Sequence, residues 1–251
     1  MYYGLYMSAA GAHSQSQKVQ VLSNNIANGA TVGFKRELAL LESRESEAIE
    51  QGLARRGSRT VEDVGGGAAL RATATDFAPG DLQKTDNPTD FAIEGDVPDV
   101  FFLVQRGSER LLTRAGNFQL SNEGMLQTSG GDSVLNSDGD PIQIDPLREW
   151  RVVPGGIIDQ AGSRVELALV RPDKLHDLVK VGHNYFSSKS SRPVEAGDRR
   201  VRGGFRELSA IKPVQEMVEL IAASRAHEAN VRLIQQHDQA TSQLINRILR
   251  V

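Results

Sequence analysis

One stretch constrains the fold of this chain more than any other: residues 23–34, which read Ser-Asn-Asn-Ile-Ala-Asn-Gly-Ala-Thr-Val-Gly-Phe. Three asparagines in five positions suit a helix interior poorly, because their side chains compete for backbone groups and favour caps and turns. Gly29 and Gly33 then permit backbone angles that other residues resist. We therefore expect a helix to end near Asn28 and the chain to leave it through a specified, polar turn. An ordinary helix end followed by a loop is the alternative interpretation of the same residues.

The composition of the chain argues against several classes of function. Its 251 residues allow one large domain or two modest ones. A net charge of -3 argues against a nucleic-acid partner bound through a broad basic face. The absence of cysteine excludes a disulfide framework, a thiolate nucleophile and a zinc–thiolate site. Aromatic residues make up only 5% of the chain, which predicts a lean core.

The first residues of the sequence carry no pattern of a targeting or membrane-spanning segment. Residues 1–11 lack a basic region, a long apolar region and a small-residue cleavage site. We therefore expect neither a cleaved secretory signal nor a membrane span. Taken alone, this predicts a cytoplasmic protein.

A helix that needs a partner is predicted over residues 4–26. Apolar or small residues recur there every three or four positions, which is the spacing of a helix with one contact face. Most of these residues are small, so the face allows close approach but buries little area. A single helix this polar is marginal in water, so we expect a second helix to cover it. The positions on the predicted face are Leu5, Ala9, Ala12, Ser16, Val19, Leu22 and Ile26.

The end of the chain returns to a helical period and supplies the expected partner. The dipeptide Lys212-Pro213 suits a helix start with proline at its first position. Arg225, His227 and Glu228 interrupt the apolar stripe near its middle. The apolar positions of this stripe are Val214, Met217, Val218, Ile221, Val231, Ile234, Leu244, Ile245, Ile248 and Leu249.

The region between the first helix and the centre of the chain is harder to assign. Residues 35–42 fit either a second short helix or an extended arm. Residues 43–74 are charged and glycine-rich, and few apolar residues repeat with either period. A mobile linker and an arm that becomes ordered on assembly both fit this composition.

Residues 77–186 show short apolar runs separated by turn residues, which predicts a small antiparallel β domain. The fold class is therefore α+β: antiparallel terminal helices in a coiled coil, with a central, mainly antiparallel β domain. We expect residues 1–42 and 210–251 to form one terminal helical coiled-coil domain, residues 43–76 an extended linker or arm, and residues 77–209 the central β domain. The predicted strands are 91–93, 100–104, 111–114, 118–120, 126–128, 142–144, 151–153, 157–158 and 165–170.

We expect no catalytic site, cofactor or metal. None of the five histidines, which are His13, His176, His183, His227 and His237, lies in a metal-binding spacing. Residues 136–140, Asn-Ser-Asp-Gly-Asp, hint at a calcium loop but lack its bidentate glutamate, so a β-turn is favoured. The basic run at 199–202 is interpreted as a solvated face rather than an anion site.

The stretch at residues 23–34 resembles a signature of the bacterial flagellar basal-body rod and hook proteins. That signature reads Asn-Asn-apolar-Ala-Asn-x-x-Thr-x-Gly-Phe. One departure is the pair Gly29-Ala30, where the family usually has an apolar or small residue and then asparagine. The matching residues are Asn24, Asn25, Ile26, Ala27, Asn28, Thr31, Gly33 and Phe34.

Two further stretches follow the same family in order. In the centre they are residues 79–82, 85–96, 101–102 and 113–118, and towards the end they are residues 216–218 and 224–230. His227 stands where the family usually has tyrosine. Residues 97–100, Val-Pro-Asp-Val, interrupt a family motif, and we expect a longer or reshaped hairpin there.

The resemblance implies a structural subunit of the flagellar basal body, most like the proximal rod protein, and not an enzyme. Implied partners are other rod and basal-body subunits, in homo- and hetero-oligomers, and the flagellar export apparatus. The subunit would reach the periplasm-spanning rod without a cleaved signal, which overrides the cytoplasmic prediction. Alternatives are a distal rod or hook-type subunit or, in a different class, a soluble β-domain enzyme or ligand-binding module.

The resemblance also implies which residues form the assembly interface. Leu5, Ala9, Val19, Leu22 and Ile26 would pair with Met217, Ile221, Val231, Ile234 and Ile248. The turn that seats the helix pair against neighbouring subunits would be shaped by Asn24, Asn25, Asn28, Thr31, Gly33 and Phe34.

Overall fold

The computed structural model describes residues 2–53, 55, 57, 65–95, 97–182 and 184–248. The chain forms two compact units. The helical unit comprises Met1–Ala27, Glu37–Ala74 and Lys212–Val251, and the β unit comprises Asn28–Arg36 and Thr75–Ile211. Asp96, His183, Leu249 and the part of the predicted arm at 58–64 lie outside the described residues.

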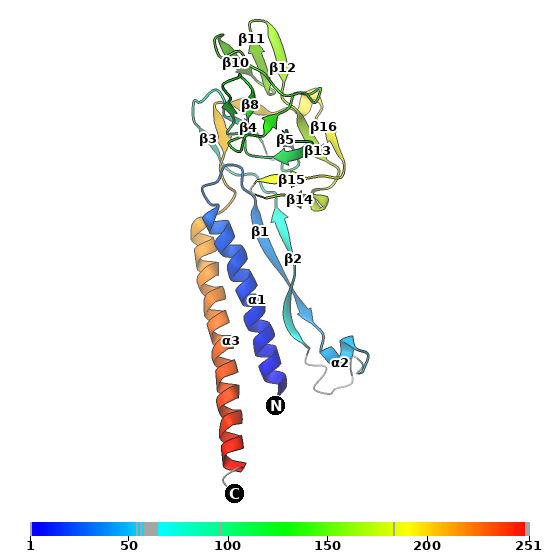
Figure 1. Cartoon of the computed structure of the whole chain (residues 1–251), viewed down its shortest axis with the longest axis vertical. Coiled ribbons are helices and arrows are strands. Elements are labelled where there is room, and N and C mark those ends of the chain that lie inside the picture. The colour runs from blue at the N-terminus through cyan, green and yellow to red at the C-terminus, as the bar shows by residue number, and fades with distance from the viewer. Residues whose placement is uncertain are drawn as a thin grey trace. The chain divides into compact units, whose positions relative to one another are not determined.

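Two long helices of opposite direction dominate the helical unit (Figure 1). Helix α1 spans Tyr2–Ala27 and helix α3 spans Pro213–Ile248, as the sequence predicts for both ends of the chain. Gly4, near the start of α1, lies against His237 in the C-terminal half of α3, and Asn25, near the end of α1, is hydrogen-bonded to Glu216 in the first turn of α3. The two helices therefore pack antiparallel. Since α1 has 26 residues and α3 has 36, the last turns of α3 extend beyond the start of α1.

The segment after α1 is a strand rather than a second helix. Strands β1 (Arg36–Arg44) and β2 (Gly67–Asp76) form a two-stranded sheet, with the short helix α2 (Glu47–Glu50) between them in sequence. This arm runs along the side of α1 that faces away from α3 (Figure 1). Two tyrosines of α1 bond to it: the Tyr3 hydroxyl donates to the Gly65 carbonyl at 2.5 Å, and Arg44 donates to the Tyr6 hydroxyl at 3.1 Å. Helix α1 is therefore covered on two sides.

The β unit is built from short strands, and every strand pair whose register is defined is antiparallel. One sheet has the order β14-β15-β6-β5-β9-β8-β7, and β13 joins it through β5 and carries β16. Strands β10, β11 and β12 form a separate sheet, and β4 pairs with β17 and β3 with β18. The strands are β3 (Leu82–Lys84), β4 (Phe91–Ile93), β5 (Phe101–Arg106), β6 (Glu109–Thr113), β7 (Gln119–Leu120), β8 (Leu126–Gln127), β9 (Ser133–Val134), β10 (Trp150–Val153), β11 (Ile157–Gln160), β12 (Ser163–Glu166), β13 (Leu169–Pro172), β14 (Val179–Lys180), β15 (Tyr185–Ser187), β16 (Ser191–Pro193), β17 (Val201–Gly203) and β18 (Phe205–Glu207).

Phenylalanine rings organise the core of the β unit. Phe118 packs against Phe91 and Phe102, with ring centroids 5.8 and 5.4 Å apart. In a second cluster, Phe77 packs against Phe101 and Phe186 at 5.8 and 5.2 Å. Aromatic pairs at such distances add stabilisation beyond their buried area. These two clusters hold six of the eight phenylalanines, so a chain with few aromatic residues concentrates them in the core of the β unit.

Four sequence expectations for the β unit need comment. The predicted strand at 142–144 forms only an isolated bridge, between Met125 and Gln143. The connection at 97–100 is not a hairpin, because β4 pairs with β17 while β5 pairs with β6, β9 and β13. The interpretation of residues 199–202 as a solvated face is wrong for Arg199, whose side chain is 8% exposed and donates to the Gly155 carbonyl at 3.2 Å. The turn at 136–140 is confirmed, with the Gly139 N–H donating to the Asn136 carbonyl at 2.9 Å.

Candidate functional site

Asn25 is a fully buried junction in the helical unit, near the end of α1. Its amide nitrogen donates to the Glu37 carbonyl at 2.9 Å, and its amide oxygen accepts from the Glu37 N–H at 3.0 Å. The same nitrogen also donates to a carboxylate oxygen of Glu216, in the first turn of α3, at 3.1 Å. A carboxamide suits this position because it carries donors and an acceptor on one short side chain. Asn25 therefore ties the end of α1 to both β1 and α3.

Replacing Asn25 with alanine should destabilise the helical unit by about 2–4 kcal/mol, because the change removes three hydrogen bonds in a dry environment. The neighbouring Asn24 is exposed, and Asn24→Ala is the matched control. Thermal unfolding followed by circular dichroism at 222 nm measures both effects. Equal stability of the two variants would show that the buried junction does not contribute as described.

The turn after α1 belongs to the β unit and depends on Gly33. The Thr31 N–H donates to the Asn28 carbonyl at 3.0 Å, and the Phe34 N–H donates to the Thr31 carbonyl at 3.3 Å. Gly33 then adopts φ +65°, a left-handed conformation that glycine enters readily. A Cβ atom at this position would lie 2.6 Å from the backbone of Arg114 and Ala115. The turn thus requires glycine for two independent reasons.

The residues that follow Gly33 are drawn into the interior of the β unit. Phe34 is 2% exposed, and the Lys180 ammonium lies 4.4 Å from the centre of its ring. The Ala210 N–H donates to the Phe34 carbonyl at 3.3 Å, and the Gly33 N–H donates to the Glu207 carbonyl at 2.8 Å. The segment just before α3 in sequence therefore holds the turn in place.

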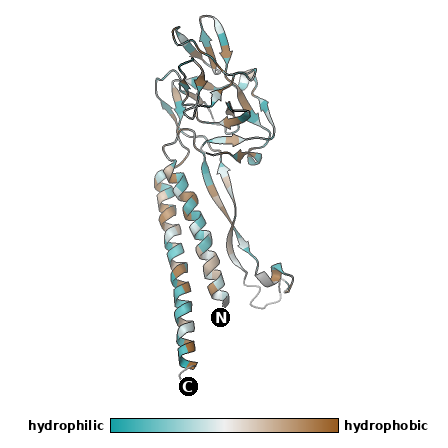
Figure 2. Cartoon of the chain, in the orientation of Figure 1, coloured by the Kyte–Doolittle hydropathy of each residue, from teal (hydrophilic) through white to brown (hydrophobic). Residues whose placement is uncertain are grey.

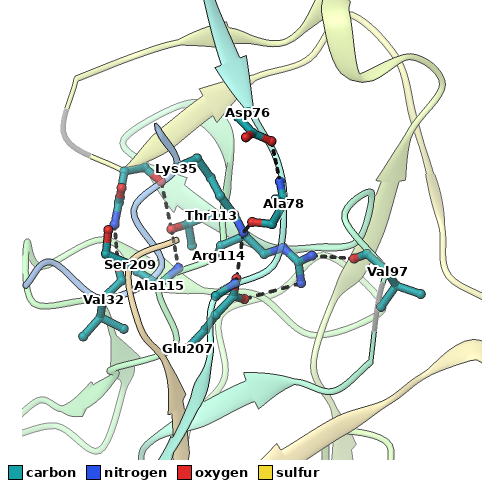
Figure 3. A network of polar contacts seen from close by, with 12 residues as sticks. Val32, Lys35, Asp76, Ala78, Val97, Thr113, Arg114, Ala115, Glu207 and Ser209 are labelled. Atoms are coloured by element: carbon teal, nitrogen blue, oxygen red, sulfur yellow. Dashed lines mark hydrogen bonds and ion pairs between the residues drawn. The ribbon is translucent and has the colours of Figure 1, made fainter. Parts of the chain in front are cut away.

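Lys35, Arg114 and Glu207 form a buried ion cluster beside this turn (Figure 3). The Lys35 ammonium lies 2.7 Å from Glu207 Oε1 and donates to the Ala78 carbonyl at 2.8 Å. Arg114 Nη1 lies 3.6 Å from Glu207 Oε2, and its Nη2 donates to the Val97 carbonyl. The Gly80 N–H donates to Glu207 Oε1 at 3.0 Å. All three ionic side chains are 2% exposed or less.

The cluster places two cations around one carboxylate in an environment without solvent. Burial lowers the pKa of Lys35 below its ordinary value, although the attraction of Glu207 acts in the opposite direction. Burial likewise lowers the pKa of Arg114. Removing three charges from water costs free energy that their mutual attraction largely offsets, so the cluster adds little net stability. Because few other arrangements would pair all three charges, the cluster favours one specific geometry. This geometry joins the turn to the end of β6 and to β18.

Sequence reasoning identified the turn but not this cluster. Glu207 lies 172 residues from Lys35, and nothing in a single sequence pairs them. Lys35 directly follows the Gly-Phe of the turn motif, and Arg114 lies inside the motif at 113–118. This closeness to a recognisable motif is the sequence signal that could have identified Lys35 and Arg114 as members of the cluster.

The exposure of four residues departs from the predicted helix pairing. Ala9 is exposed, and so are Met217, Ile221 and Ile248, which are 49%, 53% and 73% exposed. Exposure to this extent is not what pairing across the two helices within the chain predicts for these four residues. The reason is that α1 contacts partners on two sides, so its contact positions are not those of a single stripe. Ile248 also lies beyond the start of α1.

The remaining residues of the predicted interface have mixed environments. Leu22, Asn25, Gly33 and Phe34 are buried, and Asn24 and Thr31 are exposed. Those of intermediate exposure are Leu5, Val19, Ile26, Asn28, Val231 and Ile234.

Metal ligands, membrane-spanning helices and cavities are the other features that could indicate a site in the described part of the chain. There, no group of three histidine, aspartate or glutamate side chains could hold a metal ion. Within the same residues, no helix combines the length and the apolar character needed to cross a bilayer. A cavity of about 270 Å³ in the β unit is lined by residues that include Arg110, Asp138 and Arg199, and of its described lining residues Asp138 is the single carboxylate and none is a histidine.

These features describe a protein with paired terminal helices and a separate β unit, in which the buried side chains of Asn25 and Lys35 bond backbone carbonyls. Family models match the chain in three segments. A model described as flagella basal body rod protein matches residues 5–35, and one described as flagellar hook protein FlgE/F/G D1 domain matches residues 92–178. One described as flagellar basal body rod FlgEFG protein C-terminal matches residues 202–247.

Full-length relatives agree with these matches. The flagellar basal-body rod protein FlgF of Caulobacter vibrioides is 30% identical over 247 residues, which cover 97% of each chain. The rod protein FlgG of the same organism is 31% identical over 265 residues, covering 96% of this chain and 98% of the relative. The FlgG of Bacillus subtilis is 29% identical, covering 96% of this chain and 97% of the relative. The chain belongs to the flagellar basal-body rod protein family.

Proposed function

We propose that this structural subunit of the basal-body rod assembles through its terminal helices. In this proposal α1 and α3 form an antiparallel coiled coil, and the coil packs against other rod subunits to build a helical tube that transmits motor torque. Contacts that repeat head to tail without closing produce such a filament rather than a ring. The subunit has no enzymatic role, and it reaches the periplasm-spanning rod through the flagellar export apparatus.

One observation carries the proposal: the apolar residues near the start of α3 are exposed in the single chain. Val214, Met217, Val218 and Ile221 are 75%, 49%, 63% and 53% exposed, and their spacing places them on one side of the helix. Figure 2 shows hydrophobic positions of α3 interleaved with hydrophilic ones along the helix. A neighbouring subunit that covers this outer stripe would gain about 1.5–3 kcal/mol for each large side chain that becomes fully buried.

The outer stripe gives a direct test. The double variant Met217→Asp, Ile221→Asp should fold normally but should not enter the rod, because two carboxylates replace apolar contacts. Gln215→Asp, an exposed position in the same turn, is the control and should assemble. Circular dichroism reports the fold, and swimming in soft agar together with the subunit content of isolated basal bodies reports assembly. Full incorporation of the double variant would refute a role of this stripe.

We further propose the proximal rod as the position of the subunit. Residues 2–6, Tyr-Tyr-Gly-Leu-Tyr, and residues 33–40 support this choice because they are more similar to that member of the family. Relatives named FlgF and FlgG have nearly the same identity to the chain, 30% and 31%, so identity alone does not choose between these two names. Labelling the subunit in isolated basal bodies decides the question. Label next to the membrane ring is expected, and label next to the hook would contradict the proposal.

A further inference from the structure

The side of α3 that faces α1 is mostly polar or small. Between residues 216 and 241, eight of the twelve positions that are buried or of intermediate exposure recur at alternating steps of four and three, which is the spacing of one helix face. Only two of these residues are large and apolar. The positions are Glu216, Leu220, Ala223, His227, Asn230, Ile234, His237 and Thr241.

Glycines of α1 lie opposite large polar residues of α3. A Cβ atom on Gly4 would lie 3.1 Å from His237 Nε2, and a Cβ atom on Gly11 would lie 3.0 Å from Asn230 Oδ1. Each glycine lowers helix stability by about 0.5–1 kcal/mol relative to alanine. Close approach of the bulky partner explains why glycine stands at both positions.

The contacts repeat with the same offset along the helices. From Gly4 to Gly11 is a step of seven residues, and so is the reverse step from His237 to Asn230. Two further steps of seven lead to Asn25 on α1 and to Glu216 on α3, which are hydrogen-bonded at 3.1 Å. Gly4–His237, Gly11–Asn230 and Asn25–Glu216 are called the register pairs below.

A slip of one heptad would break this pattern. In one direction Asn230 would face Lys18 instead of Gly11, and Asn25 would face Ala223 and lose its bond to Glu216. In the other direction Glu216 would face Lys18, and Asn25 would have no partner on α3. A uniformly apolar face has no such preference, which is why single polar positions fix register in helix pairs.

We propose that the register pairs set the alignment of α1 and α3 within each chain, before the chain meets another subunit. These pairs contribute specificity rather than large apolar area, and the apolar residues Val214, Met217, Val218 and Ile221 of α3 remain exposed. The proposal concerns the single chain, so it stands or falls independently of rod assembly.

Exchanging the two residues of one pair tests the proposal. Gly11→Asn places two asparagines in contact and should lower both the helix content and the unfolding temperature of the helical unit. The double variant Gly11→Asn, Asn230→Gly should recover at least half of that loss. The double variant only exchanges one glycine and one asparagine between the two helices, so their combined composition is that of the parent. Intrinsic helix propensity therefore cannot explain the recovery. Ala9→Asn, on an exposed position of α1, is the control and should have a smaller effect than Gly11→Asn.

Engineered disulfides give a second readout, since the chain contains no cysteine of its own. Under a mild oxidant such as diamide, Gly11→Cys with Asn230→Cys should form an intramolecular disulfide rapidly. Gly11→Cys with His237→Cys, which lies one heptad out of register, should form it at least tenfold more slowly. Equal rates for the two pairs, or an exchange variant no more stable than Gly11→Asn, would overturn the proposal.

Discussion

Replacing Leu22 with aspartate is expected to abolish motility. Leu22 is 3% exposed in α1 and shares the heptad face of Gly4, Gly11 and Asn25. The change removes a buried apolar side chain and puts a carboxylate in its place, for a combined cost of several kcal/mol. That is a large part of the stability of a typical domain. The helix pair should separate, and the subunit should be missing from isolated basal bodies.

The next residue provides the control for this prediction. Ser23 is exposed, so Ser23→Asp introduces the same charge into the same turn of α1 without burying it. We expect Ser23→Asp cells to swim normally and their basal bodies to contain the subunit. The purified Leu22→Asp protein should lose helical signal while the β unit, which does not include Leu22, keeps its own thermal transition. Normal swimming of the Leu22→Asp strain would count against assembly through the helices.

The terminal helices could be predicted from sequence because their signals are local. The apolar spacing and the Asn-rich stop predicted α1, and Lys212-Pro213 predicted the start of α3, which begins at Pro213. Several strands of the β unit were also predicted within a residue or two, because turn residues bound each apolar run. Strand β4, at Phe91–Ile93, ends directly before Glu94-Gly95.

The contact face of α1 could not be predicted in the same way. Small residues cover this helix on nearly every side, so periodicity alone does not say which side meets which partner. Ser14, for example, is 1% exposed although it lies outside the predicted stripe. Ala10 lies against Gly67 of the arm, a contact that joins distant parts of the sequence. The predicted stripe through Ala9 takes no account of the arm, so it differs from the face that carries Gly4 and Gly11 and lies against α3.

The arm and the ion cluster were hidden for a related reason. Residues 37–42 contain no turn residue and suit a helix as well as a strand, and it is pairing with β2 that makes them a strand. Lys35, Arg114 and Glu207 carry charges that, in sequence alone, belong on a surface. The burial of Lys35 follows from the turn at Gly33, which directs the following residues into the β unit, where Lys35 meets Glu207. A tertiary contact therefore overrides the local preference in both cases.

The turn itself can be tested by Gly33→Ala, which should destabilise the β unit by about 3–5 kcal/mol. About 1–2 kcal/mol of this loss is the cost of holding alanine, which has a Cβ atom, in the left-handed conformation at φ +65°. The rest is steric, because the new methyl group would lie 2.6 Å from the backbone of Arg114 and Ala115, which cannot rotate away as a side chain could. Any relief requires the turn to move, which would stretch the 2.8 Å hydrogen bond from the Gly33 N–H to the Glu207 carbonyl.

Gly107 separates these two contributions. It belongs to the same unit and has φ +59°, but a Cβ atom there would meet nothing within 4 Å. Gly107→Ala should therefore show the backbone effect alone, about 1–2 kcal/mol. The difference between the two variants, measured by chemical denaturation of the purified protein, isolates the steric contribution of the turn. If both variants lose the same stability, the close approach of Gly33 to Arg114 does not constrain the fold, and the conformation of the turn alone explains the glycine.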